Sequence, residues 1–176
     1  MKFRNTKAIK AERVVLRSFT DKDYAALSAL LVNEEIGKTF MLPDFKSEEE
    51  KTAMCQRFKA LSESADRFVY GIYLSDELIG FINDVDITED SVELGYVIHP
   101  DYKGNGYATE ALRTAIDEIH ASGFQLVRTG AFEENIASMR VMEKCGMTKE
   151  AYENQIKYKG IVHKCIYYST KSKNPL

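Results

Sequence analysis

The sequence predicts an α/β protein of the α+β type, with a mixed sheet that carries helices on its faces. Segments typical of strands dominate the middle of the chain, from residue 67 to residue 98. One long segment with apolar residues at steps of three and four separates two of the strands, which is the pattern of an amphipathic helix. Strands in the middle with helices before, between and after them indicate a layered sheet.

The first half of the chain is predicted to contain one strand, two helices and a hairpin. Thr20 or Asp21 is expected to cap the first helix. Ser47 is expected to begin the second helix, where Glu50 three residues later completes a capping-box pattern. The short turn SDE joins the two hairpin strands. The predicted strands cover residues 12–19, 67–74 and 77–87, and the predicted helices cover residues 20–32 and 47–64.

The second half alternates strands and helices and ends in a pair of strands. Gly123 is expected to close the long amphipathic helix and Gly146 the short helix after it. The predicted strands cover residues 91–98, 124–132, 148–158 and 163–170. The long helix follows the glycine loop and runs through His120, and the short helix covers residues 135–146. The total is seven strands and four helices. We expect a single domain over residues 1–176, because this length suits one core.

Composition excludes several classes of function. The net charge of −3 gives no general affinity for nucleic acid or an acidic membrane. No apolar run approaches the length of a membrane span. The three cysteines lack metal-ligand spacing and the three histidines form no HxxxH pair, which argues against a metal site. An odd number of cysteines is typical of a reduced, cytoplasmic protein.

A glycine loop before the long helix predicts an anion site. In HPDYKGNGYATEAL, Gly104 and Gly106 would allow a phosphate to approach the backbone, and Lys103 adds positive charge. The N–H groups of the helix start would face the anion, from Asn105 through Gly106, Tyr107 and Ala108 to Thr109. The dinucleotide fingerprint lacks its third glycine here, and no P-loop pattern exists. A plain turn with a capped helix is the alternative.

Three segments in order resemble the GNAT acyl-CoA N-acyltransferases. They are ELGYVIHPDY, KGNGYATEAL and ENIASMRVMEKCGM, and the opening ERVVLRSFTDKDYAAL is similar as well. The chain looks most like the RimJ/RimL-like branch, which acetylates the N-termini of ribosomal proteins. Lys103, Gly106 and Ala108 fall on the family's loop pattern, with lysine in place of the usual Gln or Arg. The resemblance implies the GNAT fold, a mostly antiparallel seven-stranded sheet with about four helices that splays between two central strands.

The resemblance also implies acetyl-CoA as co-substrate and no metal. The loop would hold the pyrophosphate, and the pantetheine arm would lie between the strands ELGYVI and FQLVRTGAF. Backbone groups of Val97 and Ile98 would pair with that arm and polarise the thioester. Asn135 falls on the family's pantetheine-contacting asparagine, and Ser138 and Lys144 are expected to make further contacts. Helix capping is the simpler alternative for Asn135 and Ser138.

Glu93 is the expected base for deprotonating the amine. Strand alternation places it on one face with Gly95 and Val97, and Gly95 would leave space beside it. Asp84 and Asp86 are rival carboxylates on the preceding strand. Many members of the family have a tyrosine that donates a proton to the leaving thiolate, whereas this chain has Met142 there. Ser138 or a water would then serve instead.

The acceptor is less well defined. NEEIGKTFMLPDFKSEEE, at residues 33–50, forms an acidic and apolar rim that suits a cationic amine, although it also reads as an ordinary loop. We expect transfer to a primary amine, and the N-terminal α-amine of a protein or peptide is the first hypothesis for this acceptor. A small amine such as a polyamine, amino acid or antibiotic is the second hypothesis, and a non-catalytic acyl-CoA-binding module is the third. A monomer and a homodimer both fit the sequence.

Overall fold

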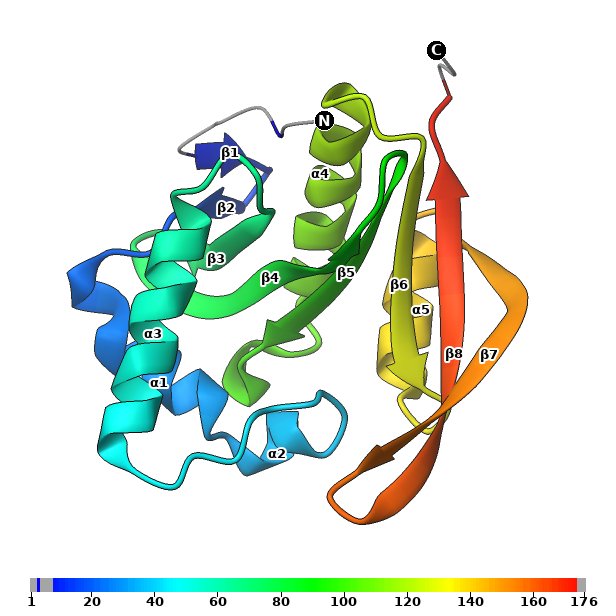
Figure 1. Ribbon diagram of the computed structural model, residues 1–176. Coiled ribbons are helices and arrows are strands. Elements are labelled where there is room, and N and C mark those ends of the chain that lie inside the picture. The colour runs from blue at the N-terminus through cyan, green and yellow to red at the C-terminus, as the bar shows by residue number, and fades with distance from the viewer. Residues whose placement is uncertain (1–2, 4–7, 174–176) are drawn as a thin grey trace.

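The computed structural model describes residues 3 and 8–173, in which eight strands form one continuous sheet (Figure 1). The strand order is β1-β2-β3-β4-β5-β6-β8-β7, and only the β5–β6 pair is parallel. The strands are β1 (Ala8–Lys10), β2 (Val14–Arg17), β3 (Val69–Leu74), β4 (Glu77–Ile87), β5 (Ser91–Ile98), β6 (Leu126–Phe132), β7 (Thr148–Tyr158) and β8 (Ile161–Lys171). The helices are α1 (Tyr24–Leu31), α2 (Glu34–Gly37), α3 (Glu48–Ser62), α4 (Tyr107–Ala121) and α5 (Ile136–Lys144), with short 3-10 turns at Asp21–Asp23 and Pro100–Tyr102.

The predicted fold class is confirmed, and the count of elements is corrected. The described residues contain eight strands and five α-helices, where seven and four were expected. Strand β1 was missed because three residues are too few to establish an alternating pattern; it pairs with β2 through Ile9 opposite Leu16. Helix α2 was missed because it has a single turn, which the Asn33 side chain caps by accepting from the Ile36 N–H at 3.0 Å.

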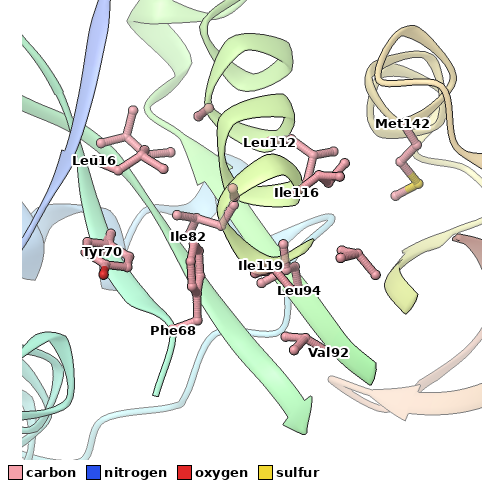
Figure 2. Packing of buried hydrophobic residues seen from close by; sticks show 14 of the residues in the cluster. Leu16, Phe68, Tyr70, Ile82, Val92, Leu94, Leu112, Ile116, Ile119 and Met142 are labelled. Carbon is pink, nitrogen blue, oxygen red and sulfur yellow. The ribbon is translucent and has the colours of Figure 1, made fainter. Parts of the chain in front are cut away.

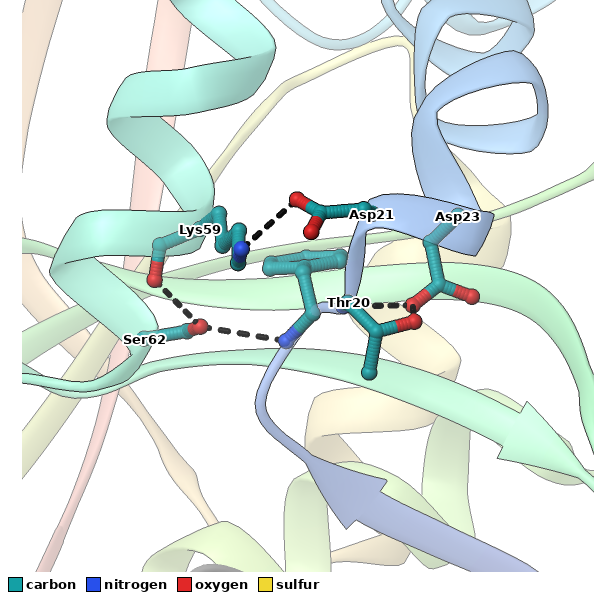
Figure 3. A network of polar contacts seen from close by, with 6 residues as sticks. Thr20, Asp21, Asp23, Lys59 and Ser62 are labelled. Carbon is teal, nitrogen blue, oxygen red and sulfur yellow. Dashed lines mark hydrogen bonds and ion pairs between the residues drawn. The ribbon is translucent and has the colours of Figure 1, made fainter.

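The first helical segments begin where the sequence predicted, at Thr20 and Ser47. Thr20 occupies the N-cap position of the 3-10 turn before α1, and its N–H and hydroxyl both donate to the Asp23 carboxylate, at 2.7 and 2.8 Å (Figure 3). Ser47 caps α3 by accepting from the Glu50 N–H at 3.2 Å. The Glu50 carboxylate accepts from the N–H of Lys46 at 2.8 Å, one residue earlier than in a standard capping box.

Two apolar clusters fill the two faces of the sheet. Helix α4 covers one face, where its stripe of Ala111, Leu112, Ala115, Ile116 and Ile119 packs on buried residues of β2 to β6 (Figure 2). Helices α1 and α3 cover the other face, over Phe81 and Val97 among others. Strand β5 is therefore buried on both sides: Val92, Leu94 and Ile98 face α4, and Val97 faces α1 and α3.

The sheet opens between β5 and β6, as predicted. The two strands pair only from Ser91 opposite Leu126 to Leu94 opposite Thr129. Beyond this point β6 continues beside β8 as far as Phe132, while β5 stays with β4 as far as Ile98. The strands diverge visibly in Figure 1. Residues 95–98 thus have no ladder partner on the β6 side, and their backbone groups there remain available to a bound chain.

Candidate active site

A cavity of about 350 Å³ occupies the opening between β5 and β6. It extends from the glycine loop, past the open edges of both strands and the first turns of α5, to Ile36, Thr39 and Phe40 in and after α2. Eleven of the residues predicted for the site line it: Val97, Ile98, Lys103, Gly104, Gly106, Tyr107, Ala108, Thr109, Asn135, Ser138 and Lys144. Asn105 and Glu93, which were also predicted, do not.

The glycine loop has the backbone geometry that its sequence indicated. Gly104 and Gly106 adopt φ angles of +79° and +84°, in the left-handed region that favours glycine. Gly106 is the N-cap of α4 and contributes no side chain, so the N–H groups of the first turn face the cavity rather than a capping group. The Asn105 amide donates to the carbonyl groups of Tyr102 and Lys103, at 3.1 and 3.2 Å. Its side chain therefore shapes the loop.

Arg13 ties this loop to the sheet, and sequence reasoning did not find it. Its guanidinium donates to the Asn105 carbonyl at 3.0 Å and to the Glu110 carboxylate at 2.9 Å, and it lies 4.8 Å from the centre of the Tyr107 ring. Glu110 also accepts from the N–H of Val14 at 2.9 Å. Burial alone would raise the pKa of Glu110, but these hydrogen bonds lower it below its usual range. No local pattern could reveal a contact between residues 97 positions apart.

The start of α5 supplies polar and cationic groups to the cavity. Asn135 caps the helix by accepting from the Ser138 N–H at 3.1 Å, a contact that leaves its NH2 group unused. The exposed cations Lys103, Arg140 and Lys144 line the cavity. Arg140 was not predicted, although it lies one helical turn before Lys144 and that spacing places the two on one face.

Three hydroxyl groups line the cavity near the end of the β5–β6 ladder. The hydroxyl oxygens of Tyr96 and Ser138 lie 2.8 Å apart. Thr129, the last β6 residue paired with β5, is 0% exposed and its Oγ1 has no hydrogen-bond partner among the described residues. Burial raises the pKa of the Tyr96 phenol well above its usual range. Tyr96 and Thr129 were missed because strand alternation marks both as packing positions.

Glu93 does not line the cavity, although it lies on the same face of β5 as Gly95 and Val97, which do. It is half-buried, opposite Arg128 on β6 and Asp86 on β4. Burial raises its pKa; Arg128 opposes this effect, and Asp86 adds to it. Arg128 is itself held by Glu150 through two contacts of 3.1 and 2.7 Å.

The space expected beside Glu93 is occupied. A Cβ atom on Gly95 would approach the Phe40 ring to 3.0 Å and the Val85 side chain to 3.3 Å. The expectation of open space was therefore wrong, because the segment after α2 folds back over β5 and its aromatic ring fills the position.

The structure gives Asp84, Met142 and Cys145 no part in the chemistry of the cavity. Asp84 is 3% exposed and binds the Arg67 guanidinium at 2.6 Å and the Phe68 N–H at 2.8 Å, so it has a structural role. Met142 is fully buried and points into the core from α5 (Figure 2), away from the residues that line the cavity. Burial raises the pKa of the Cys145 thiol to about 11, which makes it a poor nucleophile at neutral pH.

The tip of the β7–β8 hairpin contacts α2 and the segment after it, part of which lines the cavity. The hydroxyl of Tyr158, near the tip of the β7–β8 hairpin, accepts from the Leu42 N–H at 3.3 Å. A Cβ atom on Gly37 of α2 would lie 3.2 Å from the ammonium nitrogen of Lys159 in the hairpin turn. The acidic residues of the 33–50 segment are partly paired within the segment, as Glu35 with Lys38. No carboxylate lines the cavity among the described residues, so the acidic rim does not reach it.

Residues 3 and 8–173 contain neither a metal-binding cluster nor a helix that could span a membrane. No group of three or more His, Cys, Asp and Glu side chains gathers as a metal site in that part of the chain. None of the helices there is long and apolar enough to span a membrane.

Comparison with known proteins identifies the family of this chain. Residues 13–148 match the family model described as acetyltransferase (GNAT) domain. The chain is 31% identical over 155 residues to the uncharacterized N-acetyltransferase YoaA of Bacillus subtilis, covering 85% of this chain and 88% of YoaA. A GNAT-family acetyltransferase structure from Bacillus anthracis superposes with a TM-score of 0.80 at 24% identity, over 95% of this chain and 99% of the other. The ribosomal L7/L12 α-N-protein acetyltransferase RimL, solved with coenzyme A, superposes with a TM-score of 0.81 at 19% identity, over 93% and 97%.

The fold and the cavity in the open sheet define an acyltransferase of the GNAT type. The family match extends over most of the chain, and the chain belongs to the GNAT acetyltransferase family. It is an N-acetyltransferase, and its structural neighbours include the RimL branch.

Proposed function

We propose that this enzyme transfers an acetyl group directly from acetyl-CoA to the N-terminal α-amine of a protein or peptide. The observation that carries the proposal is that one cavity joins the glycine loop, the open edge of β5 and the segment after α2. A donor bound at the loop and an acceptor entering beside α2 would therefore meet between β5 and β6. The described residues of the cavity lining include no reactive cysteine and no serine paired with a base, so an acyl-enzyme is not expected. The acetyl group would therefore pass directly from donor to acceptor, which requires the two to meet.

The residues of the cavity fit acetyl-CoA. The left-handed glycines and free N–H groups of α4 suit a pyrophosphate, and Lys103, Arg140 and Lys144 add positive charge. The unpaired edge at Val97 and Ile98 would hydrogen-bond the amide groups of the pantetheine arm. The bound donor would supply an activated acetyl thioester. The unused NH2 group of Asn135 would bind the same arm.

An α-amine suits the weak base that the site offers. At pH 7, deprotonating a lysine-like amine with a pKa near 10.4 costs roughly 4.6 kcal/mol, whereas an α-amine with a pKa of 7.7 to 8.0 costs about 1 to 1.4 kcal/mol. The cavity lining contains no carboxylate or histidine among the described residues. Glu93 would accept the amine proton through water, and the raised pKa of its carboxyl brings its basicity closer to neutral pH.

A small amine is the second candidate for the acceptor. The contact between Tyr158 and Leu42 ties the β7–β8 hairpin to the segment that carries Thr39 and Phe40 of the cavity lining. A segment held in this way would restrict the entry of a chain more than that of a metabolite. The acceptors that test the proposal therefore include both classes.

Release of the CoA thiol from acetyl-CoA tests the proposal. Peptides beginning with Ala, Ser or Met would be compared with the same peptides blocked at the N-terminus but carrying an internal lysine, and with polyamines and amino acids. We expect turnover only with free α-amines. Turnover with small amines alone would replace the first acceptor class by the second. CoA binding by calorimetry without turnover on any acceptor would favour the binding module, and absence of CoA binding would refute the reading of the glycine loop.

A further inference from the structure

We propose that Tyr96 is a positioning residue that directs the Ser138 hydroxyl toward the leaving sulfur. The inference rests on the proposed function and concerns the leaving thiolate, for which this chain lacks the tyrosine proton donor that the family resemblance leads us to expect. Met142, where the sequence resemblance expects a tyrosine, is fully buried in the core and cannot donate a proton. Tyr96 reaches the same helix from the sheet side, because its hydroxyl lies 2.8 Å from the Ser138 Oγ.

Either hydroxyl of this pair can donate, because the Tyr96 and Ser138 oxygens lie 2.8 Å apart and each carries one hydrogen. The Tyr96 hydroxyl also lies 3.3 Å from the Ser138 carbonyl oxygen. We assign the Tyr96 hydrogen to the Ser138 Oγ, the nearer of its two acceptors. In this arrangement Ser138 accepts from Tyr96, and its own hydrogen is free to point into the cavity.

The contact with Tyr96 also keeps Ser138 from an unproductive state. A serine in a helix tends to donate to the backbone carbonyl one turn back. No such bond from Ser138 is present among the described residues, and its partner is the phenol instead. Tyr96 can hold this position because β5 has lost its β6 neighbour beyond Leu94, which leaves room between the strand and α5.

The proposed step moves one proton and one electron pair. The amine nitrogen forms the new C–N bond, the C–S bond breaks, and its electron pair goes to sulfur. The amine proton leaves through water toward Glu93. The Ser138 hydroxyl donates a hydrogen bond to the developing thiolate without giving up its proton, and the thiolate takes a proton from solvent on release. Tyr96 keeps its proton throughout, consistent with the raised pKa of its buried phenol.

The decisive measurement is the pKa of the CoA thiol while it is bound, read from thiolate absorbance as a difference from protein alone. A hydrogen bond to a charged group is worth enough to lower that pKa by about 1 to 2 units in the wild type. Tyr96→Phe keeps the ring and removes the hydroxyl. We expect it to raise the bound-thiol pKa by about 1 unit and to lower kcat roughly 10-fold, with KM for acetyl-CoA unchanged.

Tyr168→Phe is the matched control. The Tyr168 hydroxyl also tethers α5, through Glu143 at 3.1 Å, but Tyr168 does not line the cavity. If Tyr96 merely anchored the helix, the two variants would behave alike. We expect Tyr168→Phe to leave the bound-thiol pKa at the wild-type value.

A double variant tests whether Tyr96 acts through Ser138. Ser138→Ala should raise the bound-thiol pKa as much as Tyr96→Phe or more, and adding Tyr96→Phe to it should change nothing further. An unchanged bound-thiol pKa in Tyr96→Phe, or additive effects in the double variant, would overturn the inference. A wild type that binds no CoA or acetylates no amine would refute the proposed function instead, so the two failures are distinguishable.

Discussion

Replacing Thr129 by valine should stabilise the free enzyme and weaken its hold on the acetyl donor. Thr129 is 0% exposed, and its hydroxyl has no partner among the described residues although it lines the cavity. A buried hydroxyl without a hydrogen bond costs about 1 to 3 kcal/mol, and valine keeps nearly the same shape without that group. We therefore expect a gain of about 1 to 2 kcal/mol in the free energy of unfolding. For a chain of this size each kcal/mol raises Tm by about 2 to 4 °C.

The affinity of Thr129→Val for acetyl-CoA should decrease, in contrast to the stability of the free protein. If the acyl-pantetheine arm supplies the missing partner, valine loses that hydrogen bond, which is worth about 1 kcal/mol net, and affinity for acetyl-CoA should fall about 5-fold. Thermal unfolding with and without acetyl-CoA measures both effects in one experiment. The stabilisation of Thr129→Val by ligand should be smaller than that of the wild type.

The reverse substitution two residues earlier is the matched control. Val127 is also 0% exposed and lies on the same face of β6, within the α4 cluster. Val127→Thr introduces a hydroxyl of the same shape into a fully apolar position and should destabilise the protein by about 1 to 3 kcal/mol. If Thr129→Val lowered stability as Val127→Thr does, the Thr129 hydroxyl would already be satisfied in the free enzyme, and the reasoning would be refuted.

Three further substitutions test other parts of the site. Burial raises the pKa of the Glu93 carboxyl, so its ionised form is disfavoured in the folded state. Glu93→Gln should therefore increase the free energy of unfolding above the folded-state pKa and leave it unchanged below about pH 4.5. The same variant should shift the rise of activity to higher pH, and unfolding and rate measurements over a pH series check both effects. Glu110→Gln should weaken the clamp to Arg13 and Val14, lowering stability by about 1 to 2 kcal/mol and CoA affinity several-fold by calorimetry; unchanged affinity would mean that the loop holds its shape without the clamp. Met142→Tyr should overpack the core and cost about 1 to 3 kcal/mol in unfolding free energy, and a faster enzyme would contradict the assignment of Met142 to the core.

The loop and the helix after it were predictable because their signals are local. Glycine is favoured where φ is positive just before a helix, so Gly104 and Gly106 predicted the conformation of this loop without any knowledge of the fold. The caps at Thr20 and Ser47 and the stripe of α4 were predicted on the same basis, since each depends on residues within one or two turns. The short elements β1 and α2 carried too few residues for a pattern and were missed.

The surroundings of Glu93 and Ser138 depended on contacts across the chain. Sequence alternation correctly placed Glu93 and Gly95 on one face of β5, but it could not show that Phe40 fills the space beside them. It assigned Tyr96 to packing, whereas the opening of the sheet lets that side chain reach α5 and Ser138.

The sequence by itself determined the class of protein, the backbone conformation of the glycine loop and the order of the longer elements, because these depend on periodicity, backbone conformation and residues close in the chain. Only the tertiary structure decided which hydroxyls meet in the cavity, that Arg13 and Glu110 hold the loop, and that the β7–β8 hairpin contacts the segment after α2. These contacts join residues 42, 97 and 116 positions apart. Contacts over such separations form only after the sheet register and the helix positions are fixed, and no local pattern records them.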